Sequence, residues 1–372
     1  MRKLTHQPWA FRAAAVAAAT LMAGSAPAAD SLLTLNPSIA PQDAATRPAD
    51  GAKPAAEKPA EAPKATAEPK AAEEISNAFV SDKATFLLTP SRIHGDPTIF
   101  WPGVLNGLRG FEHFYEPIGN PLYFESPFNN TGLRLLYLYH GFPDGSQIGG
   151  GYANVYAAQV RVALTERLAF IATKDGYTDM NAGILPPDDG WNDFAIGLKY
   201  VIIADKAADF VLTGGVRWEW ENGDRGVLMG KTQELSPFIS VAKGFDRLHL
   251  LGNVTGRLPM DWNDGNAIVS WDLHVDYEIA PKVLPGFAPV FEVHGLHYVS
   301  DGNALPLSVG GLDYSNIGST DVAGDSVFWA GVGARWKLSP HMSVGSTYEF
   351  PLHNPDNDIM GNRVTVDLHV TW

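Results

Sequence analysis

The densest run of side chains able to do chemistry lies between residues 270 and 278, where every second residue is polar. The run consists of Ser270, Asp272, His274, Asp276 and Glu278. A spacing of two puts all five on one face of a β-strand. Histidine beside carboxylate is a ligand set that suits zinc and other transition metals.

A second polar strand can face this one across a hairpin. If residues whose numbers sum to 566 pair, His274 lies opposite Glu292, and Asp272 lies opposite His294. His249 then stands on the neighbouring strand. Alternating polar residues are also expected wherever one face of a strand meets water, so we predict no metal site.

Other motifs are equally weak. The glycine-rich stretches "IGGGY" and "GVGAR" do not stand between a strand and a helix, as a phosphate-binding loop requires. The chain has no cysteine, which excludes disulfides. We predict no cofactor and no catalytic residue.

Alternation of apolar and polar residues continues from Leu133 to the last residue, Trp372. It predicts twelve strands, each near the ten residues that a tilted strand needs to cross a bilayer. The predicted ranges are 133–140, 152–164, 167–175, 191–203, 208–220, 234–244, 247–258, 267–279, 287–299, 326–338, 341–352 and 362–372.

The predicted strands are joined alternately by brief turns and by long loops. An even number of strands with this pattern is typical of a transmembrane up-and-down antiparallel β-barrel. Closure also removes the open edges that a soluble sandwich, the alternative all-β fold, leaves exposed. We therefore predict a barrel over residues 132–372, with polar side chains inside and apolar side chains toward lipid.

The final strand carries Val364, Val366, Leu368, Val370 and Trp372 on one face. This pattern resembles the C-terminal signal of Gram-negative outer-membrane β-barrel proteins, which their assembly machinery recognises. The hairpin "VGARWKLSPHMSVGSTYEFPL" is similar to late hairpins of porin-like barrels, including the outer-membrane proteins named for a phenol-degradation pathway. The likeness implies the cell outer membrane as location and barrel assembly machinery as a partner.

The N-terminal part has three predicted regions. Basic residues, a small apolar run and Ala26-Pro27-Ala28 indicate a signal peptide over residues 1–28. Residues 29–74 form an Ala/Pro/Lys/Glu-rich segment, which predicts a disordered periplasmic linker. Residues 75–131 are rich in aromatics and predict either a periplasmic cap or a plug in the lumen.

The charge balance excludes nucleic acid as a partner. The formal net charge is −14, and loss of the three positive charges of residues 1–28 changes it to −17. Phosphate binding needs a basic surface. No segment has the uninterrupted apolar length of a transmembrane helix.

Because the polar face of each strand should point into the barrel, we predict eight residues that line the lumen. They are Arg161, Lys199, Arg217, Asp272, His274, Glu292, Arg335 and Glu349. Both signs of charge indicate either a transverse field across a narrow channel or a plugged interior joined by ion pairs. The long loops are rich in aspartate, which predicts a weak preference for cations. The longest loop, Ser300 to Asp325, is a candidate constriction.

These features predict a porin-like channel for passive diffusion of small solutes through the lipid bilayer of the outer membrane. Two alternatives remain. "HYVSDGN" resembles the His and Ser pair of outer-membrane phospholipases, but His297 and Ser300 are three residues apart and fall on opposite strand faces. A structural envelope anchor, with the linker contacting peptidoglycan, is the other alternative.

Overall fold

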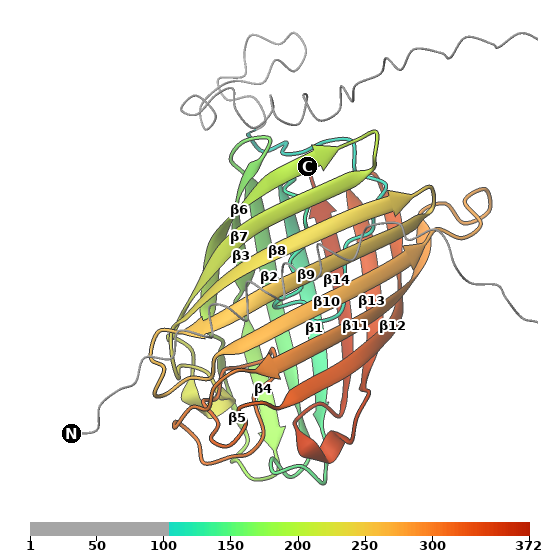
Figure 1. Ribbon diagram of the computed structural model, residues 1–372. Helices are drawn as coiled ribbons and strands as arrows, with labels where there is room; N and C mark the ends of the chain where they lie inside the picture. The colour runs from blue at the N-terminus through green and yellow to red at the C-terminus, as the bar shows by residue number, and fades with distance from the viewer. Residues whose placement is uncertain (1–103) are drawn as a thin grey trace, which may run out of the picture. The chain divides into compact units, whose positions relative to one another are not determined.

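The computed structural model describes residues 104–372, which form a barrel of antiparallel strands (Figure 1). The predicted signal peptide, the predicted linker and residues 75–103 of the aromatic segment lie outside the described residues. The strand segments are β1 (Gly132–Phe142), β2 (Gly151–Ala163), β3 (Leu168–Lys174), β4 (Tyr177–Ala182), β5 (Asp188–Trp191), β6 (Phe194–Asp205), β7 (Phe210–Trp220), β8 (Glu234–Phe245), β9 (Leu248–Pro259), β10 (Ile268–Tyr277), β11 (Phe287–Tyr298), β12 (Ser326–Ser339), β13 (Met342–Pro351) and β14 (Asn362–Thr371).

The barrel has twelve spanning strands. Segments β3 and β4 both pair with β2 and are two halves of one strand. In the same way, β5 pairs with β4 while β6 pairs with β3. Strand β1 pairs with both β2 and β14, so the sheet closes on itself. The predicted all-β, twelve-stranded antiparallel barrel is confirmed.

The predicted ends of two strands were wrong. We expected strands at 167–175 and 191–203 with a loop between them, but this loop contains β4 and β5. The register of β3 against β6 shifts between Ala172 and Lys174. A bulge of this kind moves the following residues to the other face of the sheet.

The bulge explains why the alternation could not be followed in the sequence. Before it, the buried residues of β3 include Ala169 and Ile171, and after it the buried residues include Lys174, Thr178, Met180 and Ala182. The buried positions therefore change from odd to even numbers. The outward positions of β4 are also partly polar, which made this segment resemble a loop.

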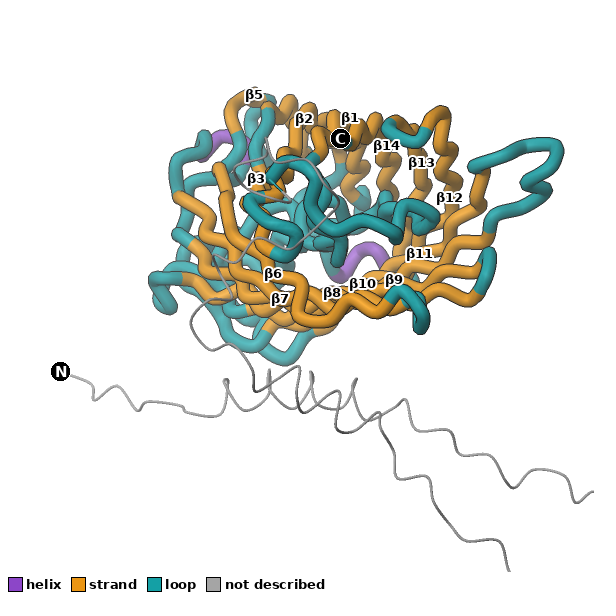
Figure 2. Tube along the Cα trace, turned by 90° about the horizontal axis from the view of Figure 1, so that it is seen from above, coloured by secondary structure: helices purple, strands orange, loops and turns teal. Residues whose placement is uncertain are grey.

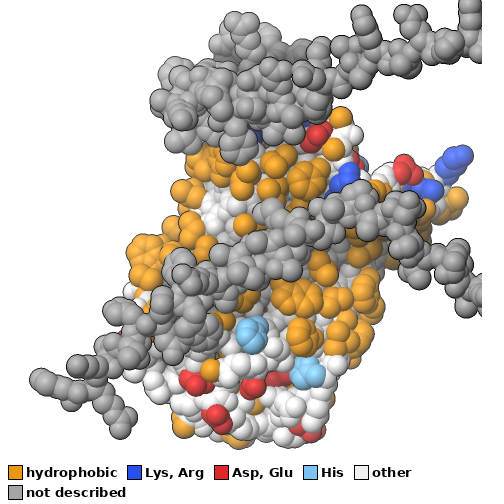
Figure 3. Space-filling view, in the orientation of Figure 1, with side chains coloured by type: hydrophobic (Ala, Val, Ile, Leu, Met, Phe, Trp, Pro, Cys, Tyr) orange, Lys and Arg blue, Asp and Glu red, His pale blue; other side chains and the backbone are white. Residues whose placement is uncertain are grey.

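The two faces of the wall differ as the alternation predicted. On β10, Asp272 and His274 are each 1% exposed, whereas Leu273 and Tyr277 are 45% and 43% exposed. Figure 3 shows hydrophobic side chains spread over the wall of the barrel. A basic side chain facing lipid at the bilayer midplane costs about 2–4 kcal/mol. This partition is that of a transmembrane β-barrel.

The two ends of the barrel are distinguished by their connections. Short turns, such as residues 246–247 and 340–341, lie at the same end as Trp372, the upper end in Figure 1. Long loops, such as residues 221–233 and 299–325, lie at the opposite end. Short turns face the periplasm in outer-membrane barrels. We call the two ends the short-turn end and the long-loop end.

Helices play little part among the described residues. Two single-turn 3-10 helices, η1 (Arg225–Val227) and η2 (Pro355–Asn357), lie in long loops. No helix within residues 104–372 is long and apolar enough to cross a membrane.

Two segments that are not part of the wall occupy the interior. Viewed along the barrel in Figure 2, loop segments lie inside the ring of strands. We call residues 104–131 the lumen segment, because its main chain bonds to side chains on the inner face of the wall. We call residues 299–325 the inward loop, because Leu312, Asp313 and Ile317 of this loop are each no more than 1% exposed.

Candidate functional site: the charged lumen of the barrel

The structure places all eight residues predicted to line the lumen on the inner face of the wall. Arg161 is partly buried, and the other seven are at most 3% exposed. Seven of the eight form hydrogen bonds to the lumen segment, and His274 reaches it through Glu292. Their role in lining a conducting path stays a prediction.

The basic side chains bind carbonyl oxygens of the lumen segment. Arg161 on β2 donates to the Asn130 carbonyl at 2.6 Å. Lys199 on β6 donates to the Ser126 carbonyl at 2.8 Å and to the Glu125 carboxylate at 2.7 Å. These charged donors satisfy main-chain acceptors that the barrel interior withdraws from water.

Two further arginines act in the same way. Arg217 on β7 donates to the Leu122 carbonyl at 2.6 Å. Arg335 on β12 donates to the Glu116 carbonyl at 2.8 Å and to the Asp367 carboxylate at 2.7 Å.

The acidic side chains bind N–H groups of the same segment. Glu292 on β11 accepts from the Ile118 N–H at 2.8 Å and the Gly119 N–H at 2.6 Å. Glu349 on β13 accepts from the Asn120 N–H at 3.2 Å, and Asp272 accepts from the Asn120 side chain at 2.6 Å. Acids on β10, β11 and β13 and bases on β2, β6, β7 and β12 therefore hold one segment between them.

Gly119 of the lumen segment lies very close to the wall. A Cβ atom at this position would lie 2.6 Å from Glu292 Oε2 and 2.8 Å from His294 Nε2. Real Cβ atoms essentially never approach a heavy atom so closely. Glycine is required here because the side chains of Glu292 and His294 are fully buried and have no room to move away from an added Cβ atom.

The predicted register of β10 against β11 is confirmed. Asp272 pairs with His294, and His274 pairs with Glu292. The His274 Nδ1 atom lies 2.7 Å from Glu292 Oε1, and the His294 Nδ1 atom lies 2.8 Å from Asp272 Oδ1. Within residues 104–372, no group of histidine and acidic side chains has the arrangement of a metal site. The juxtaposed residues are used as hydrogen-bond partners of each other.

The inward loop closes the long-loop end with an apolar cluster. Val309, Leu312, Tyr314 and Ile317 pack with wall and loop residues that include the fully buried Trp329. Wall residues Glu234 on β8, Arg257 on β9 and Arg363 on β14 form hydrogen bonds to this loop. This confirms that the longest loop folds inward, as its length suggested.

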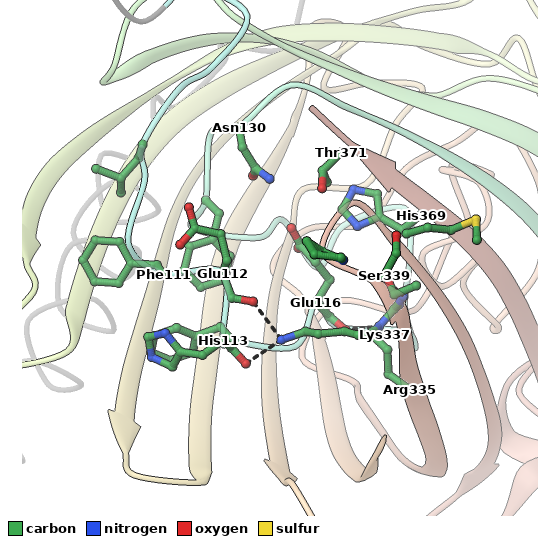
Figure 4. Close-up of a pocket in the computed structure, with 16 residues that line it drawn as sticks. Phe111, Glu112, His113, Glu116, Asn130, Arg335, Lys337, Ser339, His369 and Thr371 are labelled. Atoms are coloured by element: carbon green, nitrogen blue, oxygen red, sulfur yellow. Dashed lines mark hydrogen bonds between the residues drawn. The ribbon is translucent and has the colours of Figure 1, made fainter. Parts of the chain in front are cut away.

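A hollow of about 350 Å³ opens at the short-turn end (Figure 4). Phe111 and Phe114 of the lumen segment form part of its lining, together with Lys337 and His369 of the wall. The Lys337 ammonium donates to the Glu112 and His113 carbonyls at 2.9 and 2.6 Å. Solvent can therefore enter the barrel from the short-turn end until it meets the lumen segment.

The His297 and Ser300 pair does not form. The His297 ring instead lies 2.8 Å from Ser326 Oγ, on the adjacent strand. Ser300 Oγ accepts from the Ala267 N–H at 2.9 Å. The sequence suggested neither contact, because Ser326 is 29 residues away from His297.

Other interior residues were missed by the sequence reasoning. Lys174 lies 2.5 Å from Glu219 inside the barrel, but it follows the bulge that reversed the faces of its strand. Glu234 and Tyr123 also form central contacts. The alternation along β8 could have placed Glu234 inside the barrel. Tyr123 lies outside the strands, so no periodic pattern in the sequence indicates its position.

Comparison with known proteins gives likeness of fold only. No protein-family model and no curated protein matches the chain. An outer membrane channel from Pseudomonas putida F1 has 10% identity and a TM-score of 0.48 over 70% of this chain and 100% of its own. The NanC porin has 9% identity and a TM-score of 0.38, over 65% and 98% of the two chains. The KdgM porin has 10% identity and a TM-score of 0.38, over 64% and 99%.

Proposed function

We propose that this protein is an outer-membrane channel for passive diffusion of small solutes, and that the lumen segment and the inward loop restrict its conductance. The observation that carries the proposal is the way in which the interior is filled. Wall side chains do not fill it by packing on each other. Two segments that are not part of the wall fill it. The lumen segment is bound to charged wall residues by hydrogen bonds, and it also packs Phe111, Phe114 and Phe128 against a small apolar part of the wall.

The polar part of this interface can exchange its partners for water when it opens. A protein hydrogen bond to a charged group contributes about 1.5–3 kcal/mol net, because water replaces the partner when the bond opens. An apolar core has no such replacement, and exposing it costs about 25 cal/mol for each Å². Displacement of the lumen segment would therefore leave a hydrated path lined by both signs of charge.

We further propose a weak preference for cations. Aspartates are exposed at the long-loop end, among them Asp144, Asp301, Asp321 and Asp356. On the face shown in Figure 3, acidic side chains gather at the lower, long-loop end of the barrel. Acidic groups around an entrance raise the local concentration of cations and repel anions.

Conductance of the purified full-length protein in planar bilayers tests the proposal. We expect small, discrete current steps that become larger when the lumen segment is weakened by Arg217→Ala. Glu221→Gln, at an exposed residue of a long loop, is the control and leaves the steps unchanged. Absence of conductance in both proteins would reject the channel.

The alternatives give different results in the same preparation. A lipid hydrolase would release fatty acid from phospholipid in detergent and lose this activity on His297→Ala. An envelope anchor would be retained on purified peptidoglycan and would carry no current. The narrower resemblance to outer-membrane proteins named for a phenol-degradation pathway stays a prediction, as does assembly by the barrel machinery.

A further inference from the structure

The inward loop and the lumen segment both lie inside the barrel and form no direct hydrogen bond to each other. Among residues 104–372, no hydrogen bond or ion pair joins residues 299–325 to residues 104–131. Both are nevertheless bound to the same wall side chains. The shared side chains form two buried pairs of opposite charge.

The first shared pair is Glu234 on β8 and Arg257 on β9, which are both fully buried. Their side chains are 2.8 Å apart, from Arg257 Nε to Glu234 Oε1. Toward the lumen segment, Glu234 accepts from the Tyr123 hydroxyl at 2.9 Å, and the Arg257 guanidinium lies 4.1 Å from the centre of the Tyr123 ring.

The same pair also holds the inward loop. Arg257 donates to the Leu312 carbonyl at 2.6 Å. Glu234 Oε2 accepts from the Asn316 side chain at 3.0 Å. Each member of the pair therefore has one partner in the lumen segment and one in the loop.

The second shared pair is Glu349 on β13 and Arg363 on β14. Arg363 donates to both carboxylate oxygens of Asp313 in the loop, at 2.8 and 2.6 Å. Its guanidinium also lies 3.9 Å from the Glu349 carboxylate. Glu349 accepts from the Asn120 N–H of the lumen segment at 3.2 Å.

We propose that the inward loop and the lumen segment are one coupled closure, in which release of either weakens the attachment of the other. Withdrawal of the loop removes a partner from Arg257 and from Arg363, both buried. Each guanidinium then turns toward other acceptors or toward entering water, and the carboxylate beside it loses its alignment with Tyr123 or Asn120. Hydrogen-bond networks in a low-dielectric interior lose more than one bond when one member leaves.

The coupling is reciprocal, because the effect of one site on another is a shared free energy. Displacement of the lumen segment from the periplasmic side would loosen the loop at the opposite face of the membrane. The consequence for permeation rests on the proposed channel function, but the coupling itself does not require transport.

Hydrogen exchange measured by mass spectrometry on the full-length protein in detergent micelles tests the coupling. The loop variant Asp313→Asn with Asn316→Ala removes the charge that pairs with Arg363 and the amide that donates to Glu234, so it weakens the loop contacts to both shared pairs. We expect amides of residues 118–124, which this variant does not touch, to exchange at least about fivefold faster. Asp321→Asn, an exposed aspartate of the same loop, is the matched control and leaves these amides unchanged.

The reciprocal variant is Tyr123→Phe, which removes a single hydroxyl and keeps the ring over Arg257. We expect faster exchange in residues 309–319 of the loop. Additivity is tested in the protein that carries the loop variant and Tyr123→Phe together. Its increase in exchange rate should be smaller than the product of the two separate fold-increases, because the shared contacts can be lost only once.

Faster exchange in the loop with unchanged exchange in residues 118–124 would overturn the proposal. The amides of β10 to β12, which are paired within the wall and are expected to exchange slowly, serve as the internal standard for an intact barrel. If amides of β10 to β12 exchange quickly in the loop variant, its barrel is not intact. The proposal is then tested by Tyr123→Phe, through the exchange rates of residues 309–319. Coupled exchange without conductance would keep this inference and reject the channel.

Discussion

At the scale of single residues, the lumen is organised by side chains that bind main-chain groups. Glu292 receives two consecutive N–H groups, from Ile118 and Gly119. Arg217 and Arg335 donate to carbonyls of the same segment. Charged wall side chains that bind main-chain groups hold the lumen segment in place almost regardless of which side chains the segment itself carries. The exception is Gly119, where a side chain has no room.

Gly119→Ala should weaken the attachment of the lumen segment. The added methyl group would lie within 2.8 Å of Glu292 Oε2 and His294 Nε2, and overpacking of a buried contact costs about 1–3 kcal/mol. We expect faster amide exchange in residues 118–124 and larger conductance steps. Gly256→Ala on β9 is the control, because a Cβ there meets nothing closer than 4.0 Å. Equal behaviour of the two variants would contradict the close approach.

At the scale of elements, the inward loop is attached by a buried ion pair that depends on pH. Burial alone would raise the pKa of Asp313, but the neighbouring Arg363 guanidinium outweighs burial and holds the pKa below its usual value of 3.8. A carboxylate with a lowered pKa stabilises the docked loop above its unperturbed pKa. This contribution is lost as the pH falls through the lowered value.

Loop docking should therefore be constant from about pH 8 to about pH 4 and weaken only below that. The measurement is exchange of residues 309–319, corrected for the intrinsic dependence of exchange on pH. Asp313→Asn should abolish the acid step and leave the loop less protected at neutral pH. A wild-type step near neutrality would contradict the assignment to Asp313.

The last strand is the second element with a testable role. On β14 the side chains of Arg363, Thr365 and Asp367 are buried, while Val366 is exposed to the lipid side. Trp372 follows this strand, and its N–H donates to the Thr131 carbonyl at 3.0 Å. The strand therefore joins the barrel wall to the end of the lumen segment.

Trp372→Ala should reduce the yield of folded barrel in the outer membrane, since a terminal aromatic resembles the signal that assembly machinery recognises. The folded fraction is measured by the shift in electrophoretic mobility on heating. Trp336→Ala, another exposed tryptophan, is the control. Equal yields from both variants would argue against the terminal residue as a signal.

At the scale of the whole molecule, the distribution of charge should decide ion selectivity. With the acidic groups at the long-loop end, we expect reversal potentials that favour potassium over chloride. The preference should decline between 0.1 and 1 M salt, because the Debye length falls from about 10 Å to about 3 Å. Asp321, Asp325 and Asp356 changed together to asparagine should reduce it further. A preference for chloride in the wild-type protein would count against the acidic entrance.

The sequence by itself determined the wall of this protein. Alternation with a period of two fixed which residues face lipid and which face the interior, and the turn lengths gave the number of strands. The register assumed for β10 against β11, with Asp272 opposite His294, is also the one observed. These features depend on local geometry, which neighbouring residues specify.

Only the tertiary structure decided what fills the barrel. The contact between Ile118 and Glu292 joins residues 174 positions apart, and the contact between Arg363 and Asp313 joins residues 50 apart. Neither the lumen segment nor the inward loop has a repeating pattern, so their conformations are set by distant partners on the finished wall. The bulge before Lys174 had the same effect on a smaller scale, because one extra residue reversed the faces of a strand without changing its composition.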